Sequence, residues 1–153
     1  MDSATVIAAW WGAVVATFAF LWEIFRWFKS GPRVQVRAKA NMEPVNVQGL
    51  EKNEKYIFVE VTNAGDRATT ITHFCAYIFN DCIKRLVNKP EKKLVILNNS
   101  GFGPPIPFFL DSGQRWTGGI LQNQFDEKLI SDGKVYACIF HTASSKPVLS
   151  QVT

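Results

Sequence analysis

The chain has 153 residues and a formal net charge of +4, and 47% of its residues are hydrophobic. After an N-terminal apolar run, about 120 residues remain, which is enough for one small domain with its own core but not for two. We therefore expect a transmembrane helix with its juxtamembrane junction in residues 1–32 and one domain in residues 33–153.

The N-terminal apolar run predicts a membrane anchor. Residues 4–22 contain no charged side chain. At about 1.5 Å per residue, a helix of this length just spans a bilayer core of roughly 30 Å. A secretory signal peptide is the alternative, but it requires basic residues before the run and a small-residue cleavage site after it. Here Arg26, Lys29 and Arg33 all follow the run. Because basic flanks stay in the cytoplasm, the N-terminus is expected outside and the domain in the cytoplasm.

One face of the expected helix consists of small residues. Ala8, Gly12 and Ala16 recur every four positions. Small side chains at this spacing let two helix backbones approach closely in lipid. The seam predicts a homo-oligomer formed through the membrane helix, although Ala-rich spans also occur in monomeric anchors.

Beyond the junction at residues 30–32, apolar and polar residues alternate with the period of two that is typical of strands. Turn signals rich in Gly, Pro, Asn, Asp and Ser separate the apolar runs. We expect a single helical turn at residues 126–130, and turns at residues 88–90 and 144–147 among others. Strands are expected at residues 34–40, 57–62, 69–79, 82–87, 93–97, 107–110, 114–120, 135–142 and 148–152.

So many short strands predict a mainly β domain, an Ig-like antiparallel β-sandwich, rather than a doubly wound α/β fold, which needs helices between its strands. Asp132, Tyr136 and Cys138 resemble the Asp-x-x-x-Tyr-x-Cys corner of immunoglobulin domains, where the tyrosine hydroxyl fixes the start of a strand. No tryptophan follows Cys75 at the distance of the core tryptophan of antibody domains. The resemblance thus implies an Ig-like architecture, not an antibody-type domain.

Three cysteines, at positions 75, 82 and 138, fall within expected strands. An odd number of thiols with apolar neighbours favours reduced core residues over a disulfide framework. If the orientation were reversed, Cys75 and Cys138 would be the candidates for an inter-sheet disulfide.

Enzymatic motifs are missing from the sequence. The two histidines, His73 and His141, belong to no metal-ligand spacing, and the sequence has no GxSxG elbow, Walker loop or GxGxxG after a strand. The glycines of residues 101–105 are followed by prolines rather than by a helix. We expect no catalytic residues, no cofactor and no metal, and therefore not an enzyme.

A basic patch is the main candidate binding surface. It consists of Lys84, Arg85, Lys89, Lys92 and Lys93, with Glu91 between them. Near a cytoplasmic leaflet such a patch attracts anionic lipid, and in an oligomer it could line a site for an anionic ligand. The alternative is a solvated edge hairpin whose lysines oppose edge-to-edge aggregation.

Phe102 is the best single candidate for a partner contact, because an aromatic side chain in a Gly/Pro loop is hard to bury. The expected partners are the lipid bilayer, a further copy of the chain, and a protein or small anionic ligand of unknown identity. No sequence-specific binding to nucleic acid is expected.

The layout permits one comparison with known families. The segment WEIFRWFKSGP, followed by IFVEVTNAGDRATTIT, resembles uncharacterised bacterial single-span membrane proteins with a C-terminal Ig-like β-sandwich. This resemblance implies the bacterial inner membrane and brings no assigned activity. In layout alone the chain is similar to membrane effectors of cyclic-oligonucleotide antiphage defence, including CRISPR accessory effectors.

The sequence therefore favours a membrane-anchored, non-enzymatic binding module with a cytosolic β-domain. The alternative is an oligomeric effector of antiphage defence, whose β-domain senses a cyclic nucleotide and whose helices disrupt the membrane. Layout does not imply function, so the alternative rests on analogy.

Overall fold

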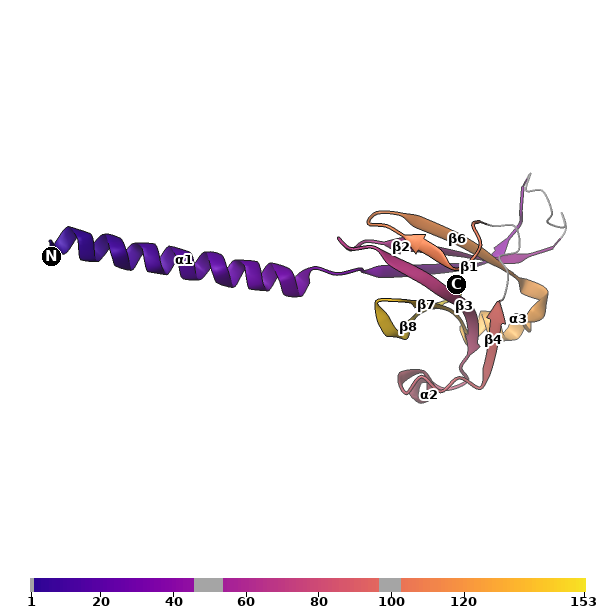
Figure 1. Cartoon of the computed structure of the whole chain (residues 1–153). Helices are drawn as coiled ribbons and strands as arrows, with labels where there is room; N and C mark the ends of the chain where they lie inside the picture. The colour runs from indigo at the N-terminus through magenta and orange to yellow at the C-terminus, as the bar shows by residue number, and fades with distance from the viewer. Residues whose placement is uncertain (1, 46–53, 97–102) are drawn as a thin grey trace. The chain divides into compact units, whose positions relative to one another are not determined.

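A computed structural model describes residues 2–45, 54–96 and 103–153 of the chain (Figure 1). The chain divides into two compact units, Met1–Gly31 and Pro32–Thr153. The boundary lies one residue before the predicted one.

The first unit is the helix α1, Ser3–Lys29, which is long and apolar enough to cross a membrane. Its 27 residues correspond to about 40 Å, more than the roughly 30 Å of a bilayer core. The described side chains of α1 are exposed, with Trp10 at 71% and Phe18 at 70%. The helix ends at Ser30, whose hydroxyl donates to the Trp27 carbonyl oxygen at 2.9 Å. Pro32 lies two residues further on, where it cannot continue a helix.

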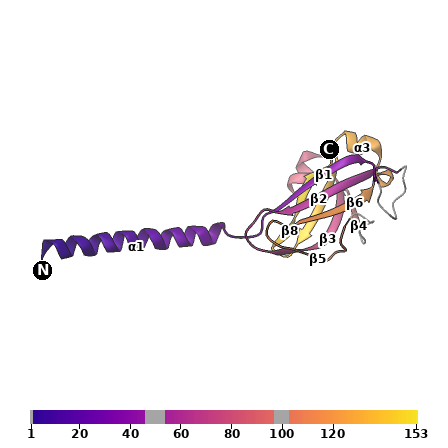
Figure 2. The same cartoon turned by 90° about the horizontal axis from the view of Figure 1, so that it is seen from above.

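The second unit is an antiparallel β-sandwich of two sheets (Figures 1 and 2). The first sheet has the order β1-β2-β6, with β1 at Val34–Met42, β2 at Tyr56–Asn63 and β6 at Arg115–Leu121. The second has the order β4-β3-β7-β8, and β5 also pairs with β3. Its strands are β3 (Thr69–Ile78), β4 (Lys92–Ile96), β5 (Phe108–Leu110), β7 (Val135–His141) and β8 (Ser144–Gln151). The fold class is therefore the predicted one.

The two sheets bury a shared apolar core. Every second residue of each strand points to the other sheet, so the alternation in the sequence becomes a buried face. Trp116 is fully buried, donates from Nε1 to the Pro104 carbonyl oxygen at 3.0 Å, and meets Phe74 edge-to-face at 5.6 Å. The core of this unit contains no residue of α1; its buried members are Ala38, Ile57, Val59, Val61, Ile71, Phe74, Ala76, Ile78, Leu110, Trp116, Ile120, Phe125, Val135, Ala137, Ile139 and Val152.

The Asn63 side chain links the residue before β1 to the turn at residues 64–68 and to the end of β5. Its side-chain oxygen accepts from the backbone N–H of Arg33 at 3.2 Å and of Gly65 at 3.1 Å. Its amide nitrogen donates to the carbonyl oxygens of Arg67 at 2.7 Å and Leu110 at 3.2 Å. Asn63 is fully buried, and all of these partners are backbone groups. The start of β1 is therefore fixed to the rest of the sandwich.

A second connection closes the opposite edge of β1. Ala38 forms a parallel bridge with Val152, the Ala40 N–H donates to the Thr153 carbonyl oxygen at 2.8 Å, and the Thr153 N–H donates to the Ala38 carbonyl oxygen at 3.3 Å. β1 thus lies between β2 on one side and residues 152–153 on the other.

The strands expected at residues 34–40, 57–62, 69–79, 107–110, 114–120 and 135–142 are confirmed with small shifts of their ends. The strand expected at residues 93–97 is confirmed as far as Ile96, and residue 97 lies outside the described residues. The helical turn expected at residues 126–130 is also confirmed, as α3, Glu127–Ser131. Asp126 caps α3, because its carboxylate accepts from the Lys128 N–H at 3.1 Å.

Two predictions of local structure are wrong. The expected strand at residues 82–87 is the helix α2, Cys82–Leu86. The expected turn at residues 144–147 is part of β8, because Ser144 pairs with His141 and the hairpin turns at residues 142–143 instead. In both segments polar and apolar residues mix without a clear period, so the sequence pattern alone does not distinguish helix, strand and turn there.

The alternative of an inter-sheet disulfide is also wrong. Cys75 and Cys138 are buried free thiols, and they lie on the neighbouring strands β3 and β7 of one sheet. The Tyr136 hydroxyl, expected to fix the strand start as in immunoglobulin domains, instead accepts from Arg85 Nη1 of α2 at 2.8 Å.

Candidate functional site

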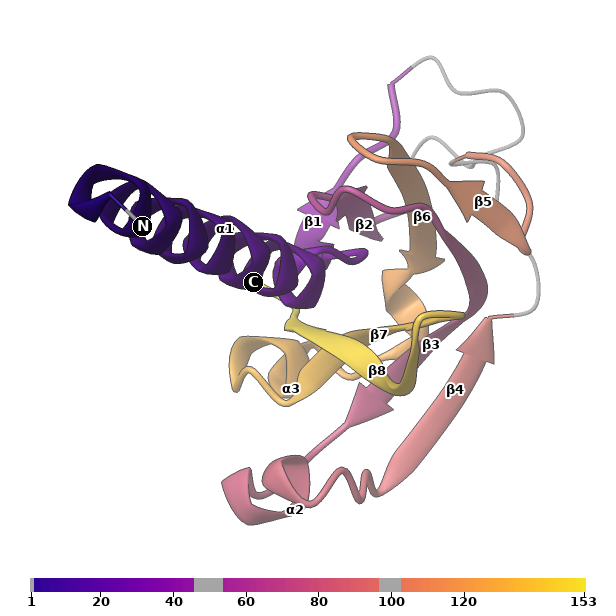
Figure 3. The ribbon, with the colours of Figure 1, turned by 60° about the vertical axis from the view of Figure 1, so that its left-hand side comes forward.

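The predicted basic patch lies on α2, the turn after it and the start of β4. Figure 3 shows α2 beyond the end of β3, leading into β4. Lys84 and Arg85 are in α2, Lys89 is in the turn, and Lys92 and Lys93 begin β4. The structure therefore brings the five residues into one short module, and Lys92 and Lys93 lie on β4, an edge strand of the second sheet.

α2 ends in a Schellman arrangement. The Lys89 N–H donates to the Lys84 carbonyl oxygen at 2.9 Å, and the Asn88 N–H donates to the Arg85 carbonyl oxygen at 3.0 Å. Asn88 has a φ of 53°, the left-handed conformation that this helix ending requires and that asparagine tolerates. The turn after α2 is thus held by backbone hydrogen bonds.

Lys84 is held by two carboxylates. Its ammonium forms an ion pair with Asp81 at 3.5 Å and another with Glu91. Asn80 also donates a hydrogen bond to Glu91. The hydrogen bond and the charge of Glu91 raise the pKa of Lys84. Because Asp81 precedes α2 and Glu91 precedes β4, Lys84 connects the two ends of the module.

Two further cations of the patch lie over aromatic rings of the second sheet. The Arg85 guanidinium lies 5.7 Å from the ring centre of Tyr136, besides its hydrogen bond to the hydroxyl. Lys93 Nζ lies 5.8 Å from the ring centre of Tyr77. These contacts fix the module to β7 and β3.

The rings belong to a second apolar cluster on the outer face of this sheet. Cys75, Tyr77 and Phe79 of the β3 segment pack there with Tyr136 and Cys138 of β7. Burial raises the pKa of Tyr77 to about 12 and that of Cys138 to about 12, and burial also raises the pKa of Cys75. The thiols are therefore neutral packing groups rather than nucleophiles.

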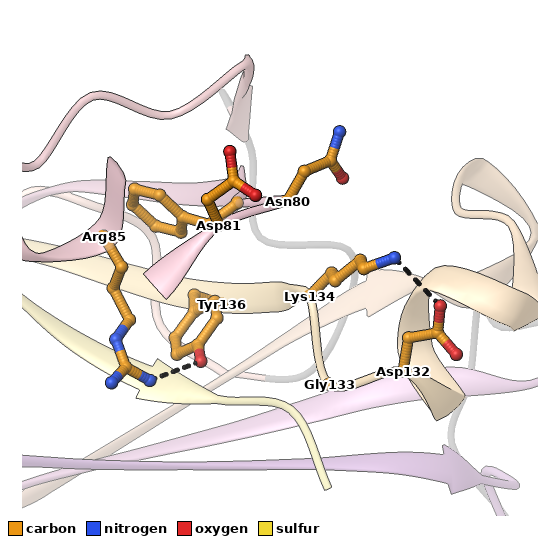
Figure 4. A pocket seen from close by; sticks show the side chains of 8 residues that line it. Asn80, Asp81, Arg85, Asp132, Gly133, Lys134 and Tyr136 are labelled. Carbon is orange, nitrogen blue, oxygen red and sulfur yellow. Dashed lines mark hydrogen bonds and ion pairs between the residues drawn. The ribbon is translucent and has the colours of Figure 1, made fainter. Parts of the chain in front are cut away.

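A small cavity of about 120 Å³ lies between α2 and the start of β7 (Figure 4). Its charged groups are Asp81, Arg85, Asp132 and Lys134, and Lys134 Nζ lies 3.0 Å from the Asp132 carboxylate. Two carboxylates thus balance two cations. This arrangement lacks the positive excess that a phosphate or nucleotide site requires.

The tip of α2 exposes two aliphatic side chains, a feature that the sequence analysis missed. Leu86 is 89% exposed and Val87 is 57% exposed. Lys89, which follows them, and Lys92 are exposed and form no ion pair with any acidic residue within the described ranges. In the expected strand at residues 82–87, one of these two neighbours would have pointed inward. Their joint exposure could therefore be predicted only by recognising that this segment is a helix.

The predicted seam lies within α1, where positions four apart such as Ala8, Gly12 and Ala16 share one face of the helix. Apart from its chain neighbours and the helix backbone, a Cβ added at Gly12 would meet no described atom within 4 Å. A shallow groove runs along a different face of the helix, lined by Trp10, Ala13, Val14, Thr17 and Phe18. Phe102, the other predicted contact residue, lies outside the described residues.

The two histidines have different surroundings. His73 meets Phe140 edge-to-face at 6.2 Å on the outer face of its sheet. His141 is buried, its Nδ1 lies 3.3 Å from the Thr69 hydroxyl, and burial lowers its pKa. In the described ranges, no group of three His, Cys, Asp or Glu side chains is placed to hold a metal ion.

Comparisons with known proteins do not place the chain in a family. No family model matches it, and no curated protein matches it. Among solved structures, the chain is similar to Northeast Structural Genomics Consortium target SoR45, an X-ray structure, with 13% identity and a TM-score of 0.30. The match covers 80% of this chain and 82% of that chain.

Proposed function

We propose that the chain is a single-span membrane protein that holds a non-enzymatic binding domain at the cytoplasmic face of the bacterial inner membrane. The observation that carries this proposal is the separation of the two units. α1 exposes its apolar side chains, among them Trp11 at 66% and Phe20 at 67%, whereas the sandwich has a core of its own. An exposed apolar surface of this length is stable in a bilayer and costly in water.

The charges around α1 support the orientation. Asp2 precedes the helix, whereas Arg26, Lys29 and Arg33 lie at or just beyond its C-terminal end. Basic residues that flank a short apolar span are retained in the cytoplasm. The domain, which follows the basic flank, is therefore proposed to face the cytoplasm.

The binding surface we propose is the α2–β4 module. Three of its cations, Lys84, Arg85 and Lys93, are held by carboxylates or aromatic rings, so this part of the surface is already ordered before a partner arrives. A preorganised surface loses less conformational entropy on binding than a mobile one. A protein or anionic partner is expected at this surface.

Two experiments on the full chain test this proposal. The full-length protein should stay with bacterial membranes after alkaline washing, whereas residues 32–153 should be recovered in solution with a β-dominated far-UV spectrum. A reporter that is active only in the periplasm, fused after Thr153, should stay silent. Release of the full chain by alkali would refute the anchor, and a strong reporter signal would refute the orientation.

The second candidate is the oligomeric effector of antiphage defence, whose helices permeabilise the membrane. One observation favours it: α1 carries the Ala8, Gly12 and Ala16 seam on one face and the groove at Ala13 and Thr17 on another. A ring of helices needs two different contact faces on each copy, whereas a symmetric dimer uses one face twice. On this candidate, β-domain binding of a cyclic nucleotide would trigger toxicity in cells.

A further inference from the structure

We propose that the tip of α2 binds the surface of an anionic bilayer, so that the domain contacts the membrane at a second place. The docking surface consists of Leu86 and Val87 with the neighbouring Lys84, Arg85, Lys89 and Lys92. This inference rests on the proposed membrane anchor and names the partner of the proposed α2–β4 surface.

The first argument is the exposure of the two aliphatic residues. Leu86 and Val87 are adjacent, and 89% and 57% of their surfaces are exposed. Single exposed aliphatic residues are common on protein surfaces, but here two neighbours stand together between basic residues. Aliphatic side chains flanked by Lys and Arg are the composition of segments that lie at the boundary between headgroups and acyl chains.

The second argument is that the tip is held in its exposed position. The Schellman hydrogen bonds of Asn88 and Lys89 close the turn directly after Val87. Arg85 binds the hydroxyl of Tyr136 in β7, which fixes the other side of α2. The aliphatic pair therefore cannot fold back onto the sheet without breaking these bonds.

The third argument is charge. Residues 81–93 contain five basic and two acidic side chains, an excess of three positive charges. Both acidic residues, Asp81 and Glu91, are paired with Lys84. Each basic residue close to an anionic leaflet contributes about 1 kcal/mol, which is about fivefold in the ratio of docked to undocked domain.

The shape of the surface decides between a bilayer and a small anionic ligand. A small ligand needs a concave site with convergent polar groups. The neighbouring cavity is concave, but of the two cations that line it, Lys134 is paired with Asp132 and Arg85 is bound to the Tyr136 hydroxyl. The unbalanced cations and the aliphatic pair lie on the projecting tip, which suits a broad surface rather than a small molecule.

The chain connection makes even weak docking effective. Four residues, 30–33, separate the end of α1 from the start of β1, and they span at most about 14 Å. The domain therefore stays within reach of the leaflet. Tethering turns docking into an intramolecular step with a high effective concentration.

The test uses the full-length chain reconstituted into vesicles. A photocrosslinking amino acid, p-benzoyl-phenylalanine, replaces Leu86, and crosslinks to lipid are counted by mass spectrometry. The vesicles are phosphatidylcholine alone, or phosphatidylcholine and phosphatidylglycerol in equal amounts. We expect strong lipid crosslinking in the anionic vesicles and several-fold less in the neutral ones. The variant with Lys89→Glu and Lys92→Glu should lower the anionic signal at least about tenfold.

Phe109 provides the matched control position. It is an exposed apolar residue at 61%, and it lies in β5, outside the basic patch. The same crosslinker there should give little lipid signal in either vesicle. Equal lipid crosslinking at the two positions, or a signal at residue 86 that ignores lipid charge, would overturn the proposal. Crosslinks from residue 86 to a second copy would also overturn it.

Flotation of the same samples after an alkaline wash separates the two proposals. If the chain floats with the vesicles but residue 86 fails these criteria, the docking is wrong and the anchor stands. If the chain does not float, the anchor is wrong, and the docking inference that rests on it is overturned as well.

Discussion

Cys75 and Cys138 lie directly opposite each other on β3 and β7, and both are buried free thiols. The Phe79 N–H donates to the Lys134 carbonyl oxygen, which makes residues 79 and 134 a hydrogen-bonded pair. Hydrogen-bonded and non-hydrogen-bonded pairs alternate along an antiparallel ladder, so Cys75 and Cys138, four residues further along, also form a hydrogen-bonded pair. The Cβ atoms of a hydrogen-bonded pair are further apart than those of a non-hydrogen-bonded pair. A disulfide needs Cβ atoms about 3.5–4.5 Å apart, so this register disfavours a bond.

The two thiols should resist alkylation in the folded protein. Burial raises the pKa of both, to about 12 for Cys138, so almost no thiolate is present at neutral pH. We expect iodoacetamide to modify Cys75 and Cys138 at least about 100-fold more slowly in the native state than in denaturant. Peptide mass spectrometry over a time course measures both sites. Rapid modification of either native thiol would contradict this account.

Asn63 should be the most sensitive polar residue of the sandwich. Asn63→Ala leaves two backbone N–H groups and two carbonyl groups without their partner, and we expect a loss of about 3 kcal/mol in the free energy of unfolding. Asn123→Ala is the control, because its exposed amide donates to the Glu54 carboxylate; the expected loss is about 0.5 kcal/mol or less. Urea unfolding of residues 32–153 gives both values. Similar losses for the two variants would refute the role of Asn63.

Gly118 should not tolerate a side chain. A Cβ at this position would lie 2.3 Å from Cη2 of Trp116, whose ring is buried and held by Pro104. Gly118→Ala should therefore cost about 2 kcal/mol of stability. Trp116→Phe removes the atoms that the Cβ would meet, so Gly118→Ala should cost less in that background. A double-mutant cycle measures the difference, and strict additivity would show that the ring is not the obstacle.

The stability of the domain should fall in mild acid because of His141. Burial lowers its pKa in the folded state below the ordinary 6.5. Below pH 6.5 the His141 imidazole is therefore protonated more readily in the unfolded chain than in the folded domain, so the free energy of unfolding decreases as the pH falls. Above pH 6.5 this contribution is complete. Urea unfolding between pH 7 and pH 5 should show the decrease, and His141→Asn should flatten it. If the free energy of unfolding fell equally with pH in the wild type and in the variant, a group other than His141 would cause the decrease.

The faces of α1 can be separated by substitution. Gly12→Leu should force helices apart at the seam and convert a crosslinked oligomer in membranes to monomer. Ala13→Leu fills the groove on another face of α1. A dimer that forms through the seam should survive this substitution, whereas a ring, which needs both faces, should not. Ile24→Leu, more than one helical turn beyond the last residue of either face, is the control. A monomeric wild-type protein would remove the physical basis of the effector alternative.

The strands were predictable where one face is buried. Val59 and Val61 of β2 face the core, and Glu60 between them does not, so the sequence period matches the packing directly. α2 was not predictable in this way, because its five residues are set by helix-ending hydrogen bonds of Asn88 and Lys89 rather than by a buried face. The residues of the basic patch were therefore found from composition, but their arrangement was not.

The exposed aliphatic residues at the tip of α2 could not be predicted for the same reason. Leu86 and Val87 are ordinary core residue types, and only their position at the end of α2 makes them exposed. The partners of Arg85 and Lys93 could not be predicted either, because Tyr136 and Tyr77 are distant in sequence and meet the patch only through the pairing of β3 with β7.

The position of β1 determines how the domain bears mechanical load. A pull applied at Arg33 in the direction of β1 loads this strand, which is bonded to β2 on one side and to residues 152–153 on the other. Tension parallel to the strand stretches these hydrogen bonds together rather than opening them one after another. Asn63 adds a further brace at the point of entry. A force applied along β1 at Arg33 therefore has to break many hydrogen bonds at once before the sandwich unfolds.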